Sequence, residues 1–216
     1  TFVKPPGYSA FGGRSWSGGC SGQRTNNVGF LSVGGGGGGC ADFRLLATAL
    51  AATETITVGA GGAAVTGVAS GNVGANTTFG SLFTVYGSSA FNRGGSVLAE
   101  GGSAITALAS NTLGNYEGWG SGATPKPTIW GGSAPSDDAT AASSSSIYGG
   151  AAGGSVNVAG TLRAAGTSMQ GGSGGAASIL GNGTAGAQPG GGGGATQTGT
   201  QSGPGGDGKL EVYGIA

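Results

Sequence analysis

The sequence predicts a mainly β and irregular fold, in which short β-strands frame a sandwich of extended polyglycine II helices, with little or no α-helix. Three observations lead to this prediction. Glycine accounts for 55 of the 216 residues, the glycines gather in runs, and apolar residues rarely recur at helical spacing. Glycine loses more conformational entropy on folding than any other residue. A chain that uses so many of them therefore indicates a structural requirement for bare backbone.

That requirement is clearest at residues 28–39, which we interpret as the segment around which the chain is organised. The apolar residues 28–33 predict a short strand, and six consecutive glycines follow directly. A disordered linker would need no strand in front of it. We therefore expect other backbone to lie against residues 34–39 too closely for a Cβ atom to fit.

Glycine clusters recur through the rest of the chain and predict further layers of the same body. An extended glycine segment can form a threefold helix of about 3.1 Å per residue with no internal hydrogen bonds. Its peptide groups then need partners on neighbouring segments. Because a strict Gly-X-Y period is absent, we expect a short bundle with loops. The clusters include residues 61–62, 94–95, 101–102, 131–132, 149–150, 153–154, 171–175, 190–194 and 205–206.

The composition limits the class of protein. Charged residues make up 7% of the chain and the net charge is zero, so no net field favours nucleic acid. Large apolar residues are too few and too scattered to predict an ordinary two-layer core. Disorder is the alternative, because so much glycine often signals low complexity. Against disorder, the chain is nearly uncharged and spaces its aromatic residues widely.

The first half of the chain predicts few regular elements. Residues 1–8 read as an extended leading segment, and residues 10–27 as a polar, glycine-punctuated loop. Residues 42–55 leave two alternatives open. Phe43, Leu46 and Leu50 are spaced for a short helix, whereas residues 54–58 alternate as a strand does.

The remaining elements are short. Residues 76–80 predict a turn and residues 81–86 a strand. Residues 209–215 alternate again, and we expect them to form an edge strand that closes a sheet begun near residue 30. We interpret the chain as one domain, with a strand-containing base over residues 1–93, a glycine-rich lattice with variable loops over 94–208, and a closing strand over 209–216.

Catalytic chemistry is poorly represented, and we expect no enzyme, metal or cofactor. There is no histidine, the usual general base and metal ligand. Cys20 and Cys40 lack zinc spacing, and the sequence leaves open whether they form a disulfide. Asp137 and Asp138 could ligate calcium, but they read more simply as part of a turn. The only Gly-Lys pair, Gly208-Lys209, continues into leucine rather than a phosphate-loop serine or threonine.

The positive signal for binding is aromatic. Tryptophan, tyrosine and arginine are favoured at binding surfaces, and here they stand in glycine- and serine-rich sequence, with residues 116–130 as the leading candidate. The alternative is that these rings fold back over the glycine segments as their apolar cover. The candidate receptor-binding residues are Arg14, Trp16, Phe91, Arg93, Tyr116, Trp119, Trp130 and Tyr148.

Several short motifs follow one another in a definite order along the chain. The apolar segment enters the glycine run at residues 33–39, and residues 56–62 read Ile-Thr-Val-Gly-Ala-Gly-Gly. Residues 76–81 read Asn-Thr-Thr-Phe-Gly-Ser, and residues 208–213 form the last strand. This order resembles that of the glycine-rich tip domains of bacteriophage tail fibres and adhesins, and the resemblance covers nearly the whole chain. Two stretches depart from the pattern, residues 10–27 and 42–55.

The resemblance implies a non-enzymatic virion protein at the tail-fibre tip, made in the host cytoplasm. Its loops would bind a protein or a glycan on the bacterial surface. The partners would be that receptor and other fibre segments, in a homotrimer or as a monomer that caps one, and no nucleic acid. Two other functions stay open. One is a structural or ice-binding polyglycine II protein, and the other is a fibre-associated depolymerase.

Overall fold

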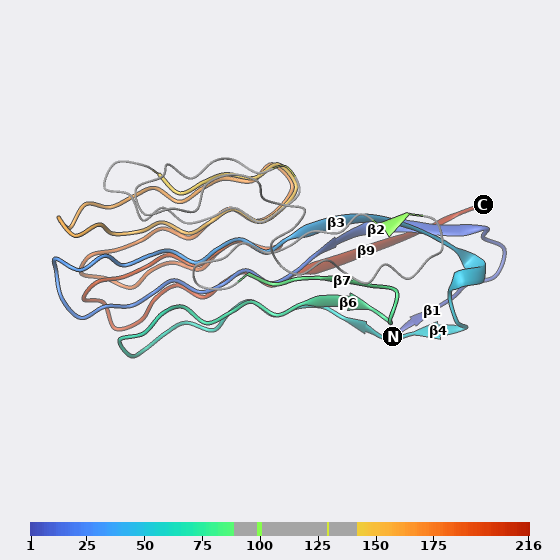
Figure 1. The fold of residues 1–216 in the computed structure, drawn as a ribbon, viewed down its shortest axis with the longest axis horizontal. Coiled ribbons are helices and arrows are strands. Elements are labelled where there is room, and N and C mark those ends of the chain that lie inside the picture. The colour runs from blue at the N-terminus through green and yellow to red at the C-terminus, as the bar shows by residue number, and fades with distance from the viewer. Residues whose placement is uncertain (89–98, 101–128, 130–141) are drawn as a thin grey trace.

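The computed structural model describes residues 1–88, 99–100, 129 and 142–216. Their arrangement confirms the predicted mainly β and irregular fold (Figure 1). Short strands gather at one end of the molecule, which we call the sheet end. Long segments without regular secondary structure run from there to turns at the opposite end. We call these segments the glycine lattice.

The sheet end contains three small sheets among the described residues. The largest has the strand order β8-β3-β2-β9, formed by Ala99–Glu100, Cys40–Leu46, Ala10–Trp16 and Lys209–Ile215. The pairs β2–β3 and β2–β9 are antiparallel, and β3–β8 is parallel. A second sheet has the order β5-β6-β7, and a third pairs β1 with β4. Their bounds are Ile56–Thr57, Thr77–Phe79 and Phe83–Val85 for the second sheet, and Phe2–Val3 and Thr53–Glu54 for the third.

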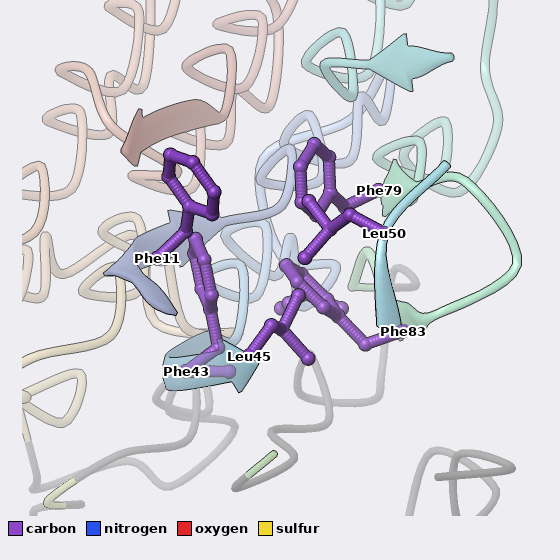
Figure 2. Packing of buried hydrophobic residues seen from close by; sticks show 8 residues of the cluster. Phe11, Phe43, Leu45, Leu50, Phe79 and Phe83 are labelled. Carbon is purple, nitrogen blue, oxygen red and sulfur yellow. The ribbon is translucent and has the colours of Figure 1, made fainter. Parts of the chain in front are cut away.

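The sheet end has an ordinary apolar core, which the sequence did not predict. Phe11, Phe43, Phe79 and Phe83 pack there with the buried Leu45, Leu50 and Val85 (Figure 2). The rings of Phe43 and Phe83 have centroids 4.8 Å apart. Ring pairs at such distances add about 0.5–1.5 kcal/mol to the area that they bury. The apolar residues are scattered in the sequence, and the sheets collect them at one end.

The prediction of a loop over residues 10–27 is wrong for residues 10–16, which form β2, an inner strand of the largest sheet. Its glycines hide the strand pattern. At Gly13 a Cβ would lie 1.9 Å from the Glu211 carbonyl oxygen and 2.6 Å from the Phe43 ring. Neighbouring groups therefore fill the space that a side chain would take, and a strand with few side chains still becomes buried.

The helix alternative for residues 42–55 is also wrong. Phe43 and Leu45 are buried while Arg44 and Leu46 are exposed, which is the period-two pattern of strand β3. Only a single 3-10 turn, η1 (Ala47–Ala49), follows it. Leu50 reaches the apolar core from the loop after η1. Its spacing from Phe43 imitated a helical face.

Three smaller expectations need correction. Residues 28–33 form no regular strand, and only Ser32 makes an isolated bridge, to Val156. Residues 77–79 are strand β6, so the turn predicted over 76–80 begins at Gly80, whose φ is +54°. Strand β9 has the predicted bounds, but it pairs with β2, which begins at residue 10 rather than near residue 30.

The glycine lattice shows the close approach predicted for residues 34–39. A Cβ atom at Gly34, Gly35, Gly37 or Gly38 would lie 1.9–2.3 Å from a backbone oxygen. Real Cβ atoms essentially never come so close to backbone. The neighbouring chains are residues 17–20 and 150–153. Glycine is therefore required along this run because its neighbours are backbone rather than side chains.

Residues 17–25 lie among several lattice segments, and their hydrogen bonds repeat every three residues. Each of the three phases of this repeat donates to a different neighbour. The N–H groups of Ser17, Cys20 and Gln23 bond to residues 39, 36 and 33, those of Gly18, Ser21 and Arg24 to residues 75, 72 and 69, and those of Gly19 and Gly22 to residues 206 and 203. Thr25, at the end of the repeat, donates to residue 196 on another segment. Three residues per turn is the repeat of the polyproline II helix.

The antiparallel neighbours of residues 34–39 follow the same repeat. Gly35 and Gly38 donate to the carbonyls of Gly193 and Gly190, and they accept from the N–H groups of Gly153 and Gly150. A step of three residues along one segment thus matches a step of three residues along its hydrogen-bonded neighbour. Backbone hydrogen bonds in three directions join segments from distant parts of the sequence into one body.

Candidate functional site

Three of the predicted binding residues, Arg14, Trp16 and Tyr148, lie together where the largest sheet meets the lattice. Arg14 and Trp16 project from β2, and Tyr148 comes from the turn after the serine run. The Trp16 indole donates to the Tyr148 carbonyl oxygen at 2.7 Å. The Arg14 guanidinium carbon lies 4.7 Å from the centroid of the Tyr148 ring and 5.8 Å from that of Trp16.

Two polar side chains, one of them charged, hold Arg14 in this position. Its guanidinium donates to both carboxylate oxygens of Asp42, with 2.9 Å between Nη2 and Oδ2, and also to Gln170 Oε1. The hydrogen bond to Asp42 raises the pKa of Arg14 above its usual value. A bidentate pair of this kind fixes the geometry as well as the charge. Trp16 is 4% exposed. Together these contacts tie the sheet to the lattice.

The other predicted residues are Phe91, Arg93, Tyr116, Trp119 and Trp130. They lie outside the described residues. Their assignment to a receptor surface stays a prediction.

The two cysteines are free and buried, so they form no disulfide with each other. Burial raises the pKa of Cys20 to about 12, and the pKa of Cys40 also rises well above its usual value. Thiols with raised pKa values stay neutral and are poor nucleophiles. Among the described residues, no group of three or more metal-ligating side chains gathers at one place. Within the same residues, no helix has the length and apolar character that crossing a membrane requires.

A second candidate surface lies at the end of the lattice away from the sheets, where the segments turn (Figure 1). We call these turns the distal loops. They are residues 26–31, 66–70, 157–162, 178–182 and 197–201.

Polar contacts join the distal loops into one surface. The buried Gln197 donates from Nε2 to the carbonyls of Phe30 and Asn157, at 2.6 and 3.0 Å. Arg24 donates from Nε to the Gly199 carbonyl and pairs through its backbone with Ala69. The Asn182 side chain accepts from the backbone N–H groups of residues 200 and 201. The loops therefore brace one another, and their geometry is set by the lattice below.

The distal loops are uncharged and carry exposed apolar side chains. None of the five contains an aspartate, glutamate, lysine or arginine. Four of them expose large apolar side chains by 50–79%, namely Val28, Phe30, Val68, Val158, Leu162 and Leu180. Scattered exposed apolar residues are normal on protein surfaces, but a gathered set marks an interaction site.

Apart from Phe30, the distal loops contain no aromatic residue and no arginine, the residue types on which the predicted binding surface depends. A usable signal was present. Each loop is a short stretch, mainly of uncharged polar and aliphatic residues, between two glycine-rich segments. Once the segments are paired antiparallel, those stretches must meet at the same end of the lattice.

Comparison with known proteins gives one family. The model of a family described as a glycine-rich domain matches residues 2–212. The chain therefore belongs to that glycine-rich domain family. No curated protein matches the chain. The family description names no activity, ligand or partner.

Proposed function

We propose that this member of the glycine-rich domain family is a non-enzymatic adhesin at the tip of a bacteriophage tail fibre, where it binds a receptor on the bacterial surface. The observation that carries the proposal is the uncharged, apolar surface of the distal loops. This surface lies at the end of the molecule opposite the sheets (Figure 1). Residues 1 and 216 both lie at the sheet end. The motif order that resembles tail-fibre tips supports the same role.

The lattice suits this role because it holds the loops with little freedom. Binding by a flexible loop costs the entropy of ordering it. Here the loops are already tied by Gln197, Arg24 and Asn182. Apolar side chains on such a rigid support can bury their surface on a partner at a smaller entropic cost. The sheet end would then face the other fibre segments, in the proposed homotrimer on the virion.

The test is adsorption of the purified, fluorescently labelled chain to a panel of bacterial strains. We expect saturable binding to at least one strain. The double variant Phe30→Ser/Leu180→Ser should reduce binding at least tenfold, because it removes two of the most exposed apolar side chains of the loops. The matched control is Val3→Ser/Val58→Ser, which changes two exposed valines at the sheet end and should bind normally.

The predicted aromatic residues are tested in the same assay. The variant Trp119→Ala/Trp130→Ala should lose adsorption while its melting temperature stays unchanged. Normal adsorption by both this variant and the distal-loop variant would remove our site assignment. A wild-type chain that binds no strain of the panel would overturn the adhesin proposal. Digestion of capsule or lipopolysaccharide by the chain would instead indicate a depolymerase.

A structural or ice-binding role is the second candidate, and one observation favours it. Ala60, Ala63 and Thr66 are all exposed at intervals of three residues along one lattice segment. A polyproline II helix repeats such positions on one side, about 9 Å apart. Thermal hysteresis of ice growth distinguishes the two functions, because an adhesin should show none.

A further inference from the structure

The outer face of the largest sheet carries an exposed tyrosine ring in a fixed place. Phe11 and Gly13 of β2 face the apolar core, so Gly12 and Arg14 face outward. The strand register sets Tyr213 of β9 opposite Gly12 on one side, and Arg44 of β3 opposite it on the other. These three residues form one row across the sheet.

The Tyr213 ring lies over the backbone of Gly12. A Cβ atom at Gly12 would lie 2.8–2.9 Å from Cε2, Cζ and the hydroxyl oxygen of the ring. The tip of the ring therefore occupies the place where a side chain would stand, and it reaches across β2 in the direction of Arg44. Tyr213 is nevertheless 61% exposed. The ring is supported from below by backbone and open to solvent above.

Polar side chains surround this ring. In the next row, Glu211 and Arg14 face outward beside it. Glu211 pairs with Lys209 at 2.6 Å, and both side chains are about half exposed. Arg44 is exposed, and no side-chain hydrogen bond or ion pair with another described residue engages it. Donors and acceptors thus stand around an accessible aromatic surface.

This combination suits a pyranose sugar. A pyranose has an apolar face of C–H bonds, which the negative face of an aromatic ring attracts, and hydroxyl groups around its edge. Arginine supplies a fork of donors and glutamate supplies acceptors for such hydroxyls. Adjacent strands lie about 4.8 Å apart and residues i and i+2 about 6.8 Å apart. Arg44 and Glu211 are therefore within one or two sugar rings of Tyr213.

We propose that Tyr213 is the platform of a saccharide site, on which a pyranose unit of a polysaccharide stacks while Arg44 and Glu211 hydrogen-bond to its hydroxyls. The site is separate from the distal loops, because it lies at the other end of the molecule. It does not rest on the adhesin proposal, and either can fail alone.

The test is saturation-transfer-difference NMR of the whole chain with methyl glucoside, methyl galactoside, N-acetylglucosamine and glucuronate. We expect saturable millimolar binding of at least one sugar, with the strongest transfer to the C–H protons of one face. Tyr213→Ala should weaken binding at least tenfold and Arg44→Ala several-fold, whereas Tyr213→Phe keeps the ring and should bind within about threefold of wild type. Tyr8→Ala, which removes another exposed tyrosine, is the matched control.

A second variant keeps the test decisive where Tyr213→Ala fails to fold. Gly12→Ala leaves the tyrosine in place but pushes its flexible ring off the backbone, so it should weaken binding as Tyr213→Ala does. Absence of saturable binding by the wild type to all four sugars would overturn the proposal. So would unchanged affinity in folded Tyr213→Ala or Gly12→Ala.

Discussion

In the sheet end, large side chains meet in an apolar core, and the strands that carry them are short. In the glycine lattice, most of the buried side chains are small, such as Ser17, Ser21 and Thr196, and backbone lies against backbone. The core is stabilised by apolar area removed from water. The lattice depends on hydrogen bonds whose net value is only about 1 kcal/mol each, so it needs many of them in three directions. The two regions should therefore respond differently to substitution.

The largest expected effect is a single methyl group in the lattice. In Gly37→Ala the new Cβ would lie 1.9 Å from the Gly150 carbonyl oxygen, and the neighbouring atoms are backbone, which cannot rotate away as a flexible side chain can. We expect a loss of more than about 4 kcal/mol, a range that point substitutions reach only exceptionally. Urea unfolding measures it. The control is Gly67→Ala, where nothing lies within 4 Å; equal stability of the two variants would contradict backbone packing.

The apolar core should tolerate the removal of a side chain better than the lattice tolerates an added methyl group. Phe79 is fully buried and contacts the rings of Phe2, Phe43 and Phe83. Phe79→Ala should lower the free energy of unfolding by about 3–5 kcal/mol, as large-to-small changes in cores do. Thermal unfolding checks this. A loss below about 1 kcal/mol would mean that the core contributes little beside the lattice.

The buried thiols make stability depend on alkaline pH. The pKa of Cys20 is raised from 9.0 to about 12 in the fold, and that of Cys40 is raised as well. The unfolded chain therefore loses these protons first, so stability is full below about pH 9 and falls as the pH rises further. Each pH unit costs at most about 1.4 kcal/mol per thiol.

Melting temperatures at pH 7.5 and pH 10 measure this dependence. The Cys20→Ala/Cys40→Ala variant has no titrating thiol, so its melting temperature should fall less between the two pH values than that of the wild type. Equal falls in the two proteins would show that the thiols are not buried as described.

The smallest effect is expected at the junction between the two regions. Trp16→Phe removes the indole N–H and leaves the Tyr148 carbonyl without that donor. We expect a loss of about 1–2 kcal/mol in urea unfolding. Adsorption should be unchanged because Trp16 is buried. If this variant lost adsorption while its fold was unchanged, Trp16 would instead be part of the receptor-binding surface.

The sequence predicted those features that depend on a short local stretch of residues. Residues 34–39 predicted the close backbone approach, because a run of glycine has no other function in an ordered body. Residues 209–215 alternate clearly enough to predict β9 with its observed bounds. Both inferences needed only local sequence.

The failures share a different cause, because each element depended on partners distant in the sequence. The space beside Gly13 and Gly12 of strand β2 is filled by the rings of Phe43 and Tyr213, which residues 10–16 alone do not reveal. Phe43 and Leu50 have helical spacing by coincidence, because Phe43 reaches the core from strand β3 and Leu50 reaches it from the loop after η1. The distal loops became a candidate site only once the antiparallel pairing brought them to one end.

The three-residue repeat of the lattice hydrogen bonds limits how this chain can vary in length. One residue added inside residues 17–25 would rotate every later N–H by a third of a turn, toward the wrong neighbour, whereas three added residues would restore all the directions. Insertions of any length in the distal loops leave the repeat untouched. Related chains should therefore differ freely in loop length, while their lattice segments lengthen or shorten in whole triplets.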